Sequence, residues 1–408
     1  PKLQKRMLAG HRPDHKKGKG LVSGIRRFLA GSLSVTLGSM AVTTPLCAVH
    51  FGTVSLVSPI TNLLVVPIIS LSFYGTLLTC VLALIGIPAA LPARLTAALL
   101  RCAAGISKIF SSLPLAAVYT KSVYIVAWLV FCYLLLVLLL LSKRKHPGAA
   151  ALCACFGLSL ALLASWAEPL TDGLRVTALD VGQGQCILLQ SRGKAYLVDC
   201  GGSQDTSAAD LAAETLLSQG ISRLDGIILT HYDRDHSGGV PLLLSRIQAD
   251  AIFLPDLEDS TNVRASIASL SDAEILPVEQ DLLLTSDGIS LHIYGPALKG
   301  DHNDASLAVL FQTDSGNVLI TGDRSDFGER RLLAKGLPTV NVLVVGHHGS
   351  KYSTCTQLLE GIRPEVALIS VSADNVYGHP NSQTLDRLEA VGCEIYRTDQ
   401  CGTILYRR

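Results

Sequence analysis

The chain has 408 residues, a formal net charge of +1 and a mean hydropathy of +0.40. These averages conceal a sharp division, because 31 of the 33 carboxylates follow residue 170. Residues 1–170 hold 16 Lys and Arg against two acids, which gives +14, and the remainder carries −13. An asymmetry of this size argues against one solvent for the whole chain, and it suggests a polyanionic partner.

A basic N-terminal segment, residues 1–27, precedes a predicted α-helical transmembrane bundle, residues 28–170. Crossing a hydrocarbon core takes roughly 20 apolar residues. The segment 122–142 meets this length most clearly, and Trp166 ends another apolar segment where an interfacial aromatic would sit. In total, four segments are predicted to span: 28–50, 60–87, 122–142 and 149–166.

Prolines interrupt two of these segments, Pro45 in the first and Pro67 in the second. Broken spans are tolerated in lipid only where other helices or a water-filled cavity satisfy the freed backbone groups, which favours a bundle with a pathway. A proline kink in an ordinary packed helix explains the same residues equally well. Residues 93–113 carry three cations at near-helical spacing and are predicted to lie in the interface as an amphipathic helix.

Orientation rests on the basic turn Lys143, Arg144 and Lys145, which the positive-inside rule places in the cytoplasm. The next span would then deliver the C-terminal half to the outside. The basic N-terminal segment is also expected inside, which needs an odd number of crossings, whereas four spans are predicted. Three explanations stay open: one segment is miscounted, 93–113 crosses, or the C-terminal half faces inward.

From residue 174 the sequence changes to short apolar runs separated by Gly, Asp and Asn, which are typical of strands and turns. Strands arriving in runs between helices predict an α/β sandwich of two mixed sheets flanked by helices, over residues 171–408. The closing strands are predicted to form a terminal hairpin. Cys393 and Cys401 flank it and are expected to be free thiols or, if the domain is outside, a pair. The predicted helices are 207–220, 327–336 and 380–392.

Polar clusters follow six of the predicted strands, where an α/β protein assembles its site. A single Asp at such a position is usually a turn or cap residue. Six clusters in the same position indicate convergence on one rim, and imidazole and carboxylate groups together bind divalent metal. The clusters are Asp199; His231, Asp233, Asp235 and His236; Asn303; Asp323; His347 and His348; and His379.

The pattern of Asp199, HxDxDH at 231–236, Asp323 and His347 resembles the metallo-β-lactamase fold, whose usual second motif is HxHxDH. Asp233 replaces the middle His. That departure, with LDVGQGQ, VGHHGSKYS and NVYGHP, resembles the ComEC family of DNA-internalisation competence channels, and SPITNLLVVPIIS resembles part of that family's transmembrane domain. The family's earlier part is absent, Pro1 is not an initiator Met, and upstream sequence is expected. Gln185 stands where the family often has Asp.

This resemblance implies a two-metal site. Asn303 falls where the wider superfamily has a metal-binding His, and Asp199 is expected to orient a ligand. Because oxygen donors replace two imidazoles, Mn²⁺ is favoured, with Zn²⁺ as the second choice. The implied ligands are His231 and Asp233 for one ion, Asp235, His236 and His347 for the other, and Asp323 as the bridge.

The implied chemistry is hydrolysis of DNA, since two ions about 4 Å apart polarise a phosphodiester and generate a hydroxide. Asp235 would act in catalysis, and His348 and His379 are candidates to protonate the departing oxygen or to bind a phosphate. Lys351 lies beside the site in sequence. The implied protein is a multi-pass channel of the bacterial plasma membrane that admits one DNA strand while an outer domain degrades the other. Its expected partners are DNA, lipid, other DNA-uptake proteins and further copies of the chain.

Two other functions remain open. The charge of −13 disfavours avid binding of DNA by the C-terminal half, so that half is alternatively a membrane-tethered hydrolase of a small ester or phosphodiester. It is alternatively a non-catalytic domain that binds or gates, with Asp233, Asn303 and Gln185 as signs of decay. The absence of acids from 28–142 suits passage of a polyanion, but lipid-embedded segments generally avoid acids.

Overall fold

The computed structural model describes residues 21–50, 52–113, 116–120, 122–143, 146–171, 173–257, 259, 261–297 and 303–408. Most of the basic N-terminal segment and the predicted turn residues Arg144 and Lys145 lie outside this part. The chain divides into two compact units, 1–134 and 135–408. The division falls inside the helix Val123–Leu141. Each unit is described by itself.

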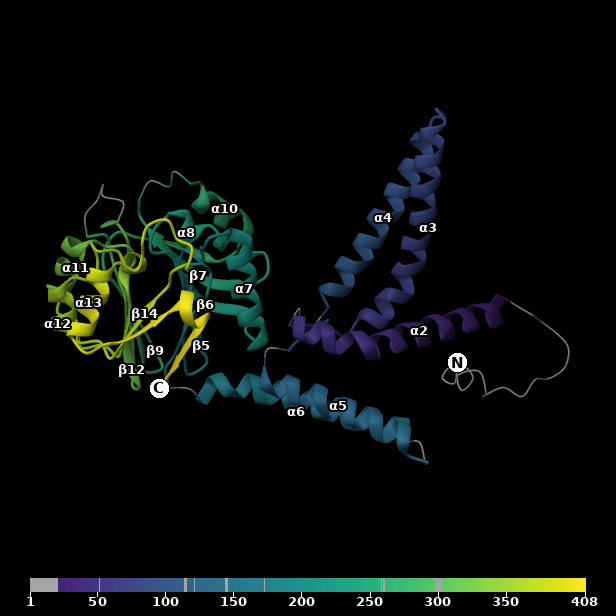
Figure 1. The fold of residues 1–408 in the computed structure, drawn as a ribbon, viewed down its shortest axis with the longest axis horizontal. Coiled ribbons are helices and arrows are strands. Elements are labelled where there is room, and N and C mark those ends of the chain that lie inside the picture. Colours follow the sequence, from purple (N-terminus) through teal and green to yellow (C-terminus); the bar gives the residue numbers. More distant parts are fainter. Residues whose placement is uncertain are drawn as a thin grey trace. The chain divides into compact units, whose positions relative to one another are not determined.

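The first unit is mainly helical (Figure 1). It contains α2 (Leu21–His50), α3 (Ser58–Leu84) and α4 (Ala90–Ser111). Two short strands, β1 (Thr53–Ser55) and β2 (Ala117–Tyr119), pair antiparallel. Helices α3 and α4 form a close hairpin, in which a Cβ at Gly75 would lie 2.4 Å from Thr96 Oγ1. A small residue at that position therefore allows the close approach, as is common between membrane helices.

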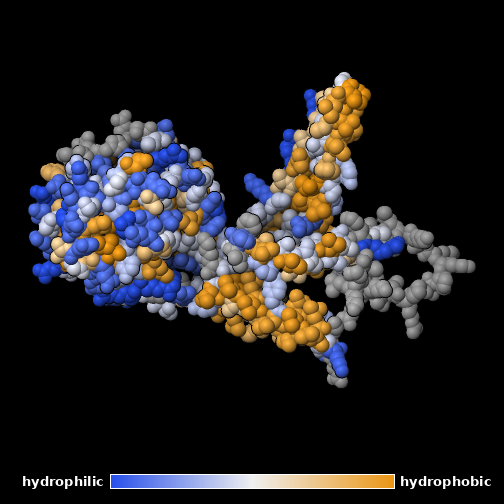
Figure 2. All heavy atoms as spheres, in the orientation of Figure 1, coloured by the Kyte–Doolittle hydropathy of each residue, from blue (hydrophilic) through white to orange (hydrophobic). Residues whose placement is uncertain are grey.

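Three helices of the described chain are long and apolar enough to cross a membrane: α3, α5 (Val123–Leu141) and residues 147–168 of α6 (Pro147–Thr171). The predicted span 28–50 is helical, within α2, and it is not among these three candidates of the described residues. Its crossing of the membrane stays a prediction. Both α2 and α3 continue through their prolines, so Pro45 and Pro67 do not break them. Figure 2 shows the apolar surfaces of these helices.

The C-terminal domain contains two seven-stranded sheets, as predicted. One sheet has the order β16-β3-β4-β5-β6-β7-β8, and the other β15-β14-β13-β12-β11-β10-β9. In each sheet one half is parallel and the other antiparallel. The strands are β3 (Arg175–Ala178), β4 (Ile187–Ser191), β5 (Lys194–Val198), β6 (Arg223–Ile228), β7 (Gln248–Pro255), β8 (Glu274–Val278), β9 (Leu282–Ser286), β10 (Ile289–Tyr294), β11 (Ala308–Thr313), β12 (Gly316–Ile320), β13 (Val342–Val344), β14 (Val366–Ile369), β15 (Glu394–Arg397) and β16 (Ile404–Arg407).

The sheets pack face to face and helices cover both outer faces (Figure 1). Because side chains alternate along a strand, Ile187 and Leu189 of β4 enter the core between the sheets, whereas Leu188 packs under the helices. The fold class is confirmed as a metallo-β-lactamase-like αββα sandwich, with its outer helices on the first and second sheet respectively. These are α7 (Asp205–Ser218), α9 (Val240–Leu244) and α10 (Val263–Leu270), then α11 (Asp326–Leu333), α12 (Thr356–Ile362) and α13 (Ser382–Ala390).

The predicted terminal hairpin is wrong. Strands β15 and β16 belong to different sheets, and the short helix α14 (Thr398–Cys401) carries the chain between them. β16 does not pair with β15 because it pairs with β3 instead, which brings the first and last strands of the domain into one sheet. Cys393 is buried, Cys401 is exposed, and both are free thiols.

Candidate metal centre

The polar clusters gather at one edge of the sandwich. Asp199 directly follows β5 and His231 follows the parallel neighbour β6, while Asp323 follows β12 and His347 follows β13. The carboxyl ends of parallel strands meet at the same edge, which is where ligands bind in α/β sheets. The turn carrying Gly201 packs against this edge so closely that a Cβ there would lie 2.4 Å from the backbone carbon of Asp235.

One group of possible metal ligands consists of His231, His236 and Asp323, all buried. Asp323 Oδ1 lies 3.2 Å from His236 Nε2, and Asp323 Oδ2 lies 3.8 Å from His231 Nε2. Among the described residues, the buried atoms His231 Nε2 and Asp323 Oδ1 have no hydrogen-bond partner. Buried polar atoms without partners lower the stability of a fold. A cation bound by His231 Nε2 and Asp323 Oδ1 would therefore stabilise the site.

A second group shares His236 and adds Asp235 and His348. His348 Nε2 lies 3.3 Å from both Asp235 Oδ2 and His236 Nε2. Two nitrogen ligands about 2.0–2.1 Å from one tetrahedral ion lie about 3.3 Å apart. The distance between His236 Nε2 and His348 Nε2 therefore fits two ligands of one divalent cation. Imidazole and carboxylate are also the groups that bind such a cation.

Asp199 lies behind these groups rather than in them. Its Oδ2 lies 2.8 Å from His236 Nδ1 and accepts hydrogen bonds from Thr230 Oγ1 and Gln185 Nε2, both at 2.8 Å. Its Oδ1 accepts one from Thr230 N at 2.7 Å. These contacts leave His236 Nε2 directed at the rim. The side chain of Gln185 thus donates to a buried carboxylate where a second acid would be repelled.

Thr230 is a site residue that the sequence did not reveal. Its Oγ1 lies 3.0 Å from His231 Nδ1 and 3.3 Å from His236 Nδ1, and it donates a hydrogen bond to Asp199 Oδ2. One hydroxyl therefore contacts both imidazoles of the motif. The only signal in the sequence is a hydroxyl at the end of the strand before HxDxDH, and Thr is common in strands.

The neighbouring His347 and His348 point to different parts of the rim. Both have left-handed backbone conformations, with φ of 50° and 54°. His348 is buried, and its Nδ1 lies 2.9 Å from the carbonyl oxygen of Ser370, which leaves Nε2 for Asp235 and His236. His347 is partly exposed, and its Nε2 lies 3.6 Å from Asp323 Oδ2. The imidazole beside Asp235 is thus that of His348.

Asp233 and Asn303 occupy more peripheral positions. Asp233 is partly exposed, with Oδ2 3.7 Å from His231 Nε2. Asn303 lies in the turn before β11, where its carbonyl oxygen accepts a hydrogen bond from Ser306 N. Ser306 Oγ in turn accepts one from Asp323 N at 3.3 Å. Asn303 therefore connects to the rim through the backbone that carries Asp323.

Electrostatics at the rim favour a cation. Burial by itself raises the pKa of Asp323, but the imidazoles of His236, His231 and His348 hold it well below its usual range. Burial lowers the pKa of His236, yet Asp323 and Asp199 raise it well above its usual value. Burial by itself raises the pKa of Asp235, but His348 and His236 lower it to about 2. Carboxylates that stay ionised in a buried site need positive charge, which a metal supplies.

His379 and Lys351 lie further out. The ring of His379 is half-buried, 5.7 Å from that of His347 and 5.8 Å from that of Tyr377. Burial, with His347 and His348, lowers the pKa of His379 to about 4. Lys351 is exposed, with Nζ 4.9 Å from the centre of the Tyr352 ring. Two exposed tyrosines therefore stand beside the outermost members of the site.

Comparisons with known proteins agree with this geometry. Residues 179–372 match the model of the metallo-β-lactamase superfamily, and residues 7–145 match the competence protein model. The C-terminal domain is thus a metallo-β-lactamase domain, of the class of metal-dependent hydrolases. The chain thus combines a competence region with a metallo-β-lactamase domain, and the curated competence proteins that it matches are members of the ComEC family.

Similar curated proteins include ComE operon protein 3 of Bacillus subtilis, 30% identical over 57% of this chain and 33% of that protein. Competence protein ComA of Neisseria gonorrhoeae is 29% identical over 57% of this chain and 32% of that protein. YcaI of Escherichia coli is 26% identical over 93% of this chain and 48% of that protein. The chain thus spans between about a third and a half of these relatives. Among solved structures, YhfI of Bacillus subtilis is 15% identical, with a TM-score of 0.43 over 58% of this chain and 100% of that one.

Proposed function

We propose that the domain hydrolyses phosphodiester bonds of DNA at the rim, and that the membrane helices form part of a channel that admits one strand while the domain degrades the other. The observation that carries the hydrolysis is the pair of ligand groups that share His236. The match of residues 7–145 to the competence protein model supports DNA as the substrate. Other DNA-uptake proteins and further copies of the chain are the partners that such a channel needs.

We assign the ligands from the geometry of the rim. His231 and Asp233 hold one ion, Asp235 and His348 hold the other, and His236 and Asp323 lie between. This assignment differs from the one that the family resemblance implies, because His348 rather than His347 lies beside Asp235. Three carboxylates among the donors favour Mn²⁺, with Zn²⁺ next. Asp199 orients His236, as outer contacts of metal-binding His residues generally do.

Bound ions supply polarisation of the phosphodiester and a hydroxide near neutral pH. The protein's own groups then position the substrate. With its pKa at about 2, Asp235 is an anion at working pH and binds a cation instead of exchanging a proton. His379 is neutral at pH 7, since its pKa is about 4, so it donates a hydrogen bond to a phosphoryl oxygen instead of a proton. His347, which is partly exposed beside Asp323, faces the same substrate.

The exposed residues of the rim favour a nucleic-acid strand over a small ester. Tyr352 and Tyr377 are each 67% exposed, which leaves ring surface open to bases although Lys351 lies over Tyr352 and His379 stacks on Tyr377. Stacking on an aromatic ring contributes roughly 1–3 kcal/mol per base without sequence preference. We assign Lys351, beside Tyr352, to the phosphate backbone. These contacts offset part of the repulsion from an acidic domain.

The spans that the structure supports agree with an outer location of the domain. If the three candidate spans of the described residues are the crossings, their odd number makes a cytoplasmic N-terminus and a cytoplasmic turn after α5 compatible with a domain outside. We therefore place the chain in the bacterial plasma membrane as a multi-pass protein. A protease that cannot enter intact cells should cleave an engineered site at Gly336, an exposed loop position, if this placement is right.

The decisive experiment uses the full chain in lipid nanodiscs with labelled single- and double-stranded DNA, and with Mn²⁺, Zn²⁺ or chelator. Asp235→Asn tests the rim, and Asp210→Asn, an exposed acid of α7, is the matched control. We expect metal-dependent cleavage by the control and none by Asp235→Asn.

Other outcomes separate the remaining functions. Cleavage of bis(p-nitrophenyl) phosphate with no cleavage of DNA would favour a small-substrate hydrolase, which the charge of −13 supports. Bound metal with neither substrate cleaved would favour a binding or gating domain.

A further inference from the structure

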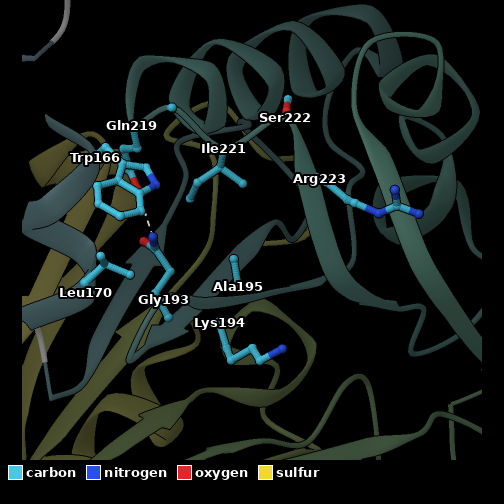
Figure 3. A pocket seen from close by; sticks show the side chains of 11 residues that line it. Trp166, Leu170, Gly193, Lys194, Ala195, Gln219, Ile221, Ser222 and Arg223 are labelled. Carbon is cyan, nitrogen blue, oxygen red and sulfur yellow. Dashed lines mark hydrogen bonds between the residues drawn. The ribbon is translucent and has the colours of Figure 1, made fainter. Parts of the chain in front are cut away.

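A cavity lies between the end of α6 and the first sheet, at the starts of β5 and β6, whose opposite ends lead to Asp199 and His231. Its volume is about 240 Å³. Figure 3 shows Trp166 and Leu170 of α6 on one side, and Lys194 of β5 and Arg223 of β6 on the other. The cavity therefore has one apolar side and one basic side.

The end of α6 is fixed to the sheet that it covers. Glu168 Oε1 lies 3.2 Å from Arg175 Nη2 and 2.9 Å from Arg407 Nη2, so it links the helix to β3 and β16. Leu170 packs over Gly193, where an added Cβ would lie 2.5 Å from Leu170 Cδ2. Gly193 also has φ of +80°, a conformation that favours glycine. These contacts make the cavity a permanent feature of the domain.

The cavity lies where α6 leaves the region apolar enough to be in a membrane. That region ends at Glu168, so Trp166 belongs to its last turn and Leu170 to the turn beyond. Leu163, Trp166 and Leu170 are separated by three and four residues and therefore share one face of the helix. All three are exposed. They form an apolar track from the span into the cavity, at the level where interfacial Trp residues sit.

The opposite margin offers donors to an anion. Lys194 Nζ lies 2.7 Å from Asp225 Oδ1, and that contact occupies one of its three donors. Gln190 and Gln219, joined by a hydrogen bond of 2.9 Å, line the floor. Lys194 and Arg223 belong to adjacent parallel strands and lie at the margin away from Trp166 (Figure 3). Arg223 likewise contacts one carboxylate, Asp250, through Nε, which leaves its other guanidinium N–H groups for an anion.

We propose that this cavity binds the phosphate headgroup of a membrane phospholipid, with the acyl chains along Leu163 and Trp166. The cavity is smaller than pockets for drug-sized molecules, which measure roughly 300–1,000 Å³. It therefore suits a headgroup alone rather than a complete lipid molecule. A soluble phosphate would contact the basic margin but not the apolar track, whereas a phospholipid contacts both. The inference rests on α6 lying in a membrane and not on the hydrolysis proposed above.

The bound lipid would hold the domain at a defined height on the bilayer. An acidic domain is repelled by the anionic lipids of a membrane surface, whose attraction for cations is about 1 kcal/mol per Lys or Arg. A specific headgroup site next to the span offsets that repulsion locally. The metal-bearing rim would then keep a constant distance from the membrane.

The test counts lipids retained by the full chain in detergent, by native mass spectrometry, with palmitoyl-oleoyl phosphatidylglycerol as the probe. Lys194→Met removes one of the two cations of the basic margin, and Ser222→Phe fills the cavity without changing charge. Lys335→Met is the matched control, because Lys335 also pairs with one Asp, at 2.6 Å, and is 38% exposed against 36% for Lys194. Circular dichroism verifies that all three variants are folded.

We expect one lipid fewer on Ser222→Phe and an affinity about fivefold lower for Lys194→Met, the factor that corresponds to about 1 kcal/mol. Lys335→Met should match the unmodified chain. Equal retention by Lys194→Met, Ser222→Phe and Lys335→Met would overturn the proposal. Displacement of the lipid by an equal concentration of inorganic phosphate would assign the cavity to a soluble phosphate and also overturn it. Because no readout depends on hydrolysis, failure here is distinguishable from failure of the nuclease.

Discussion

The membrane helices and the metal-binding domain use the same residue types in opposite ways. Leu138 of α5 is 63% exposed, whereas Leu188 of β4 is fully buried. In the domain, ionisable side chains such as Asp199 and His236 are also fully buried. Lipid solvates a leucine as well as a protein core does. A buried carboxylate is stable only where hydrogen-bond donors or positive charges surround it. The exposure of apolar side chains in the helices thus reflects a lipid environment. The burial of ionisable side chains in the domain reflects a functional site.

The largest expected effect comes from His236→Ala, because this side chain belongs to both ligand groups. We expect loss of both ions and a fall in hydrolysis on the order of 10³-fold, since metal ions contribute several kcal/mol to such reactions. Metal content by plasma mass spectrometry is the primary measurement. Ala at His292, a half-buried His of β10, is the control, and full metal content in His236→Ala would contradict the assignment.

The comparison of leucines is sharpened by truncating one from each region. Leu188→Ala should lower the free energy of unfolding of the domain by about 3 kcal/mol, because it leaves a cavity in a closely packed core. Leu138→Ala should change it by less than about 0.5 kcal/mol, since the side chain is exposed on a span. Thermal unfolding in one detergent measures both. Equal losses would show that α5 is packed in protein rather than lipid.

Asp199→Asn tests the buried carboxylate behind the rim. The amide keeps the shape but removes the charge that faces His236 Nδ1 at 2.8 Å. We expect metal affinity to fall by about 10–100-fold, the usual result for groups that orient a metal-binding His. Titration with Mn²⁺ measures the affinity, and Asp210→Asn should leave it unchanged. An unaltered affinity in Asp199→Asn would remove Asp199 from the site.

The smallest effect is a change of stability over one pH unit, and it concerns Glu329, a fully buried acid outside the two ligand groups. Burial raises its pKa to about 7, although the backbone N–H groups of Cys355 and Thr354 lower it. Since the folded-state pKa lies above the unfolded value, this group contributes stability that is full below about pH 4.5 and is lost as pH rises through about 7. The loss is about 1.4 kcal/mol per pH unit between these limits.

Glu329→Gln should remove this dependence. Unfolding measured at pH 5 and pH 6 should show the unmodified chain losing more stability than Glu329→Gln. The variant also loses one of two backbone contacts, to Thr354 N or Cys355 N, so the slope with pH is the informative quantity rather than the absolute stability. Parallel slopes for the two proteins would place the titration elsewhere.

Much of the fold was predictable because local patterns agree with the tertiary structure. The predicted helix 207–220 corresponds to α7, and the runs at 174–200 correspond to β3, β4 and β5. The terminal hairpin was wrong because two adjacent strands pair with distant partners, and distance along the chain does not encode that.

The sequence by itself determined which solvents the two halves occupy and which residue types gather at the rim, since composition and the ends of strands are local properties. Only the tertiary structure decided which of the adjacent His347 and His348 lies beside Asp235. Left-handed backbone at both residues and the carbonyl oxygen of Ser370 make that choice. It also brought Trp166 and Lys194 to one cavity, because the contacts of Glu168 with β3 and β16 join segments that are distant along the chain.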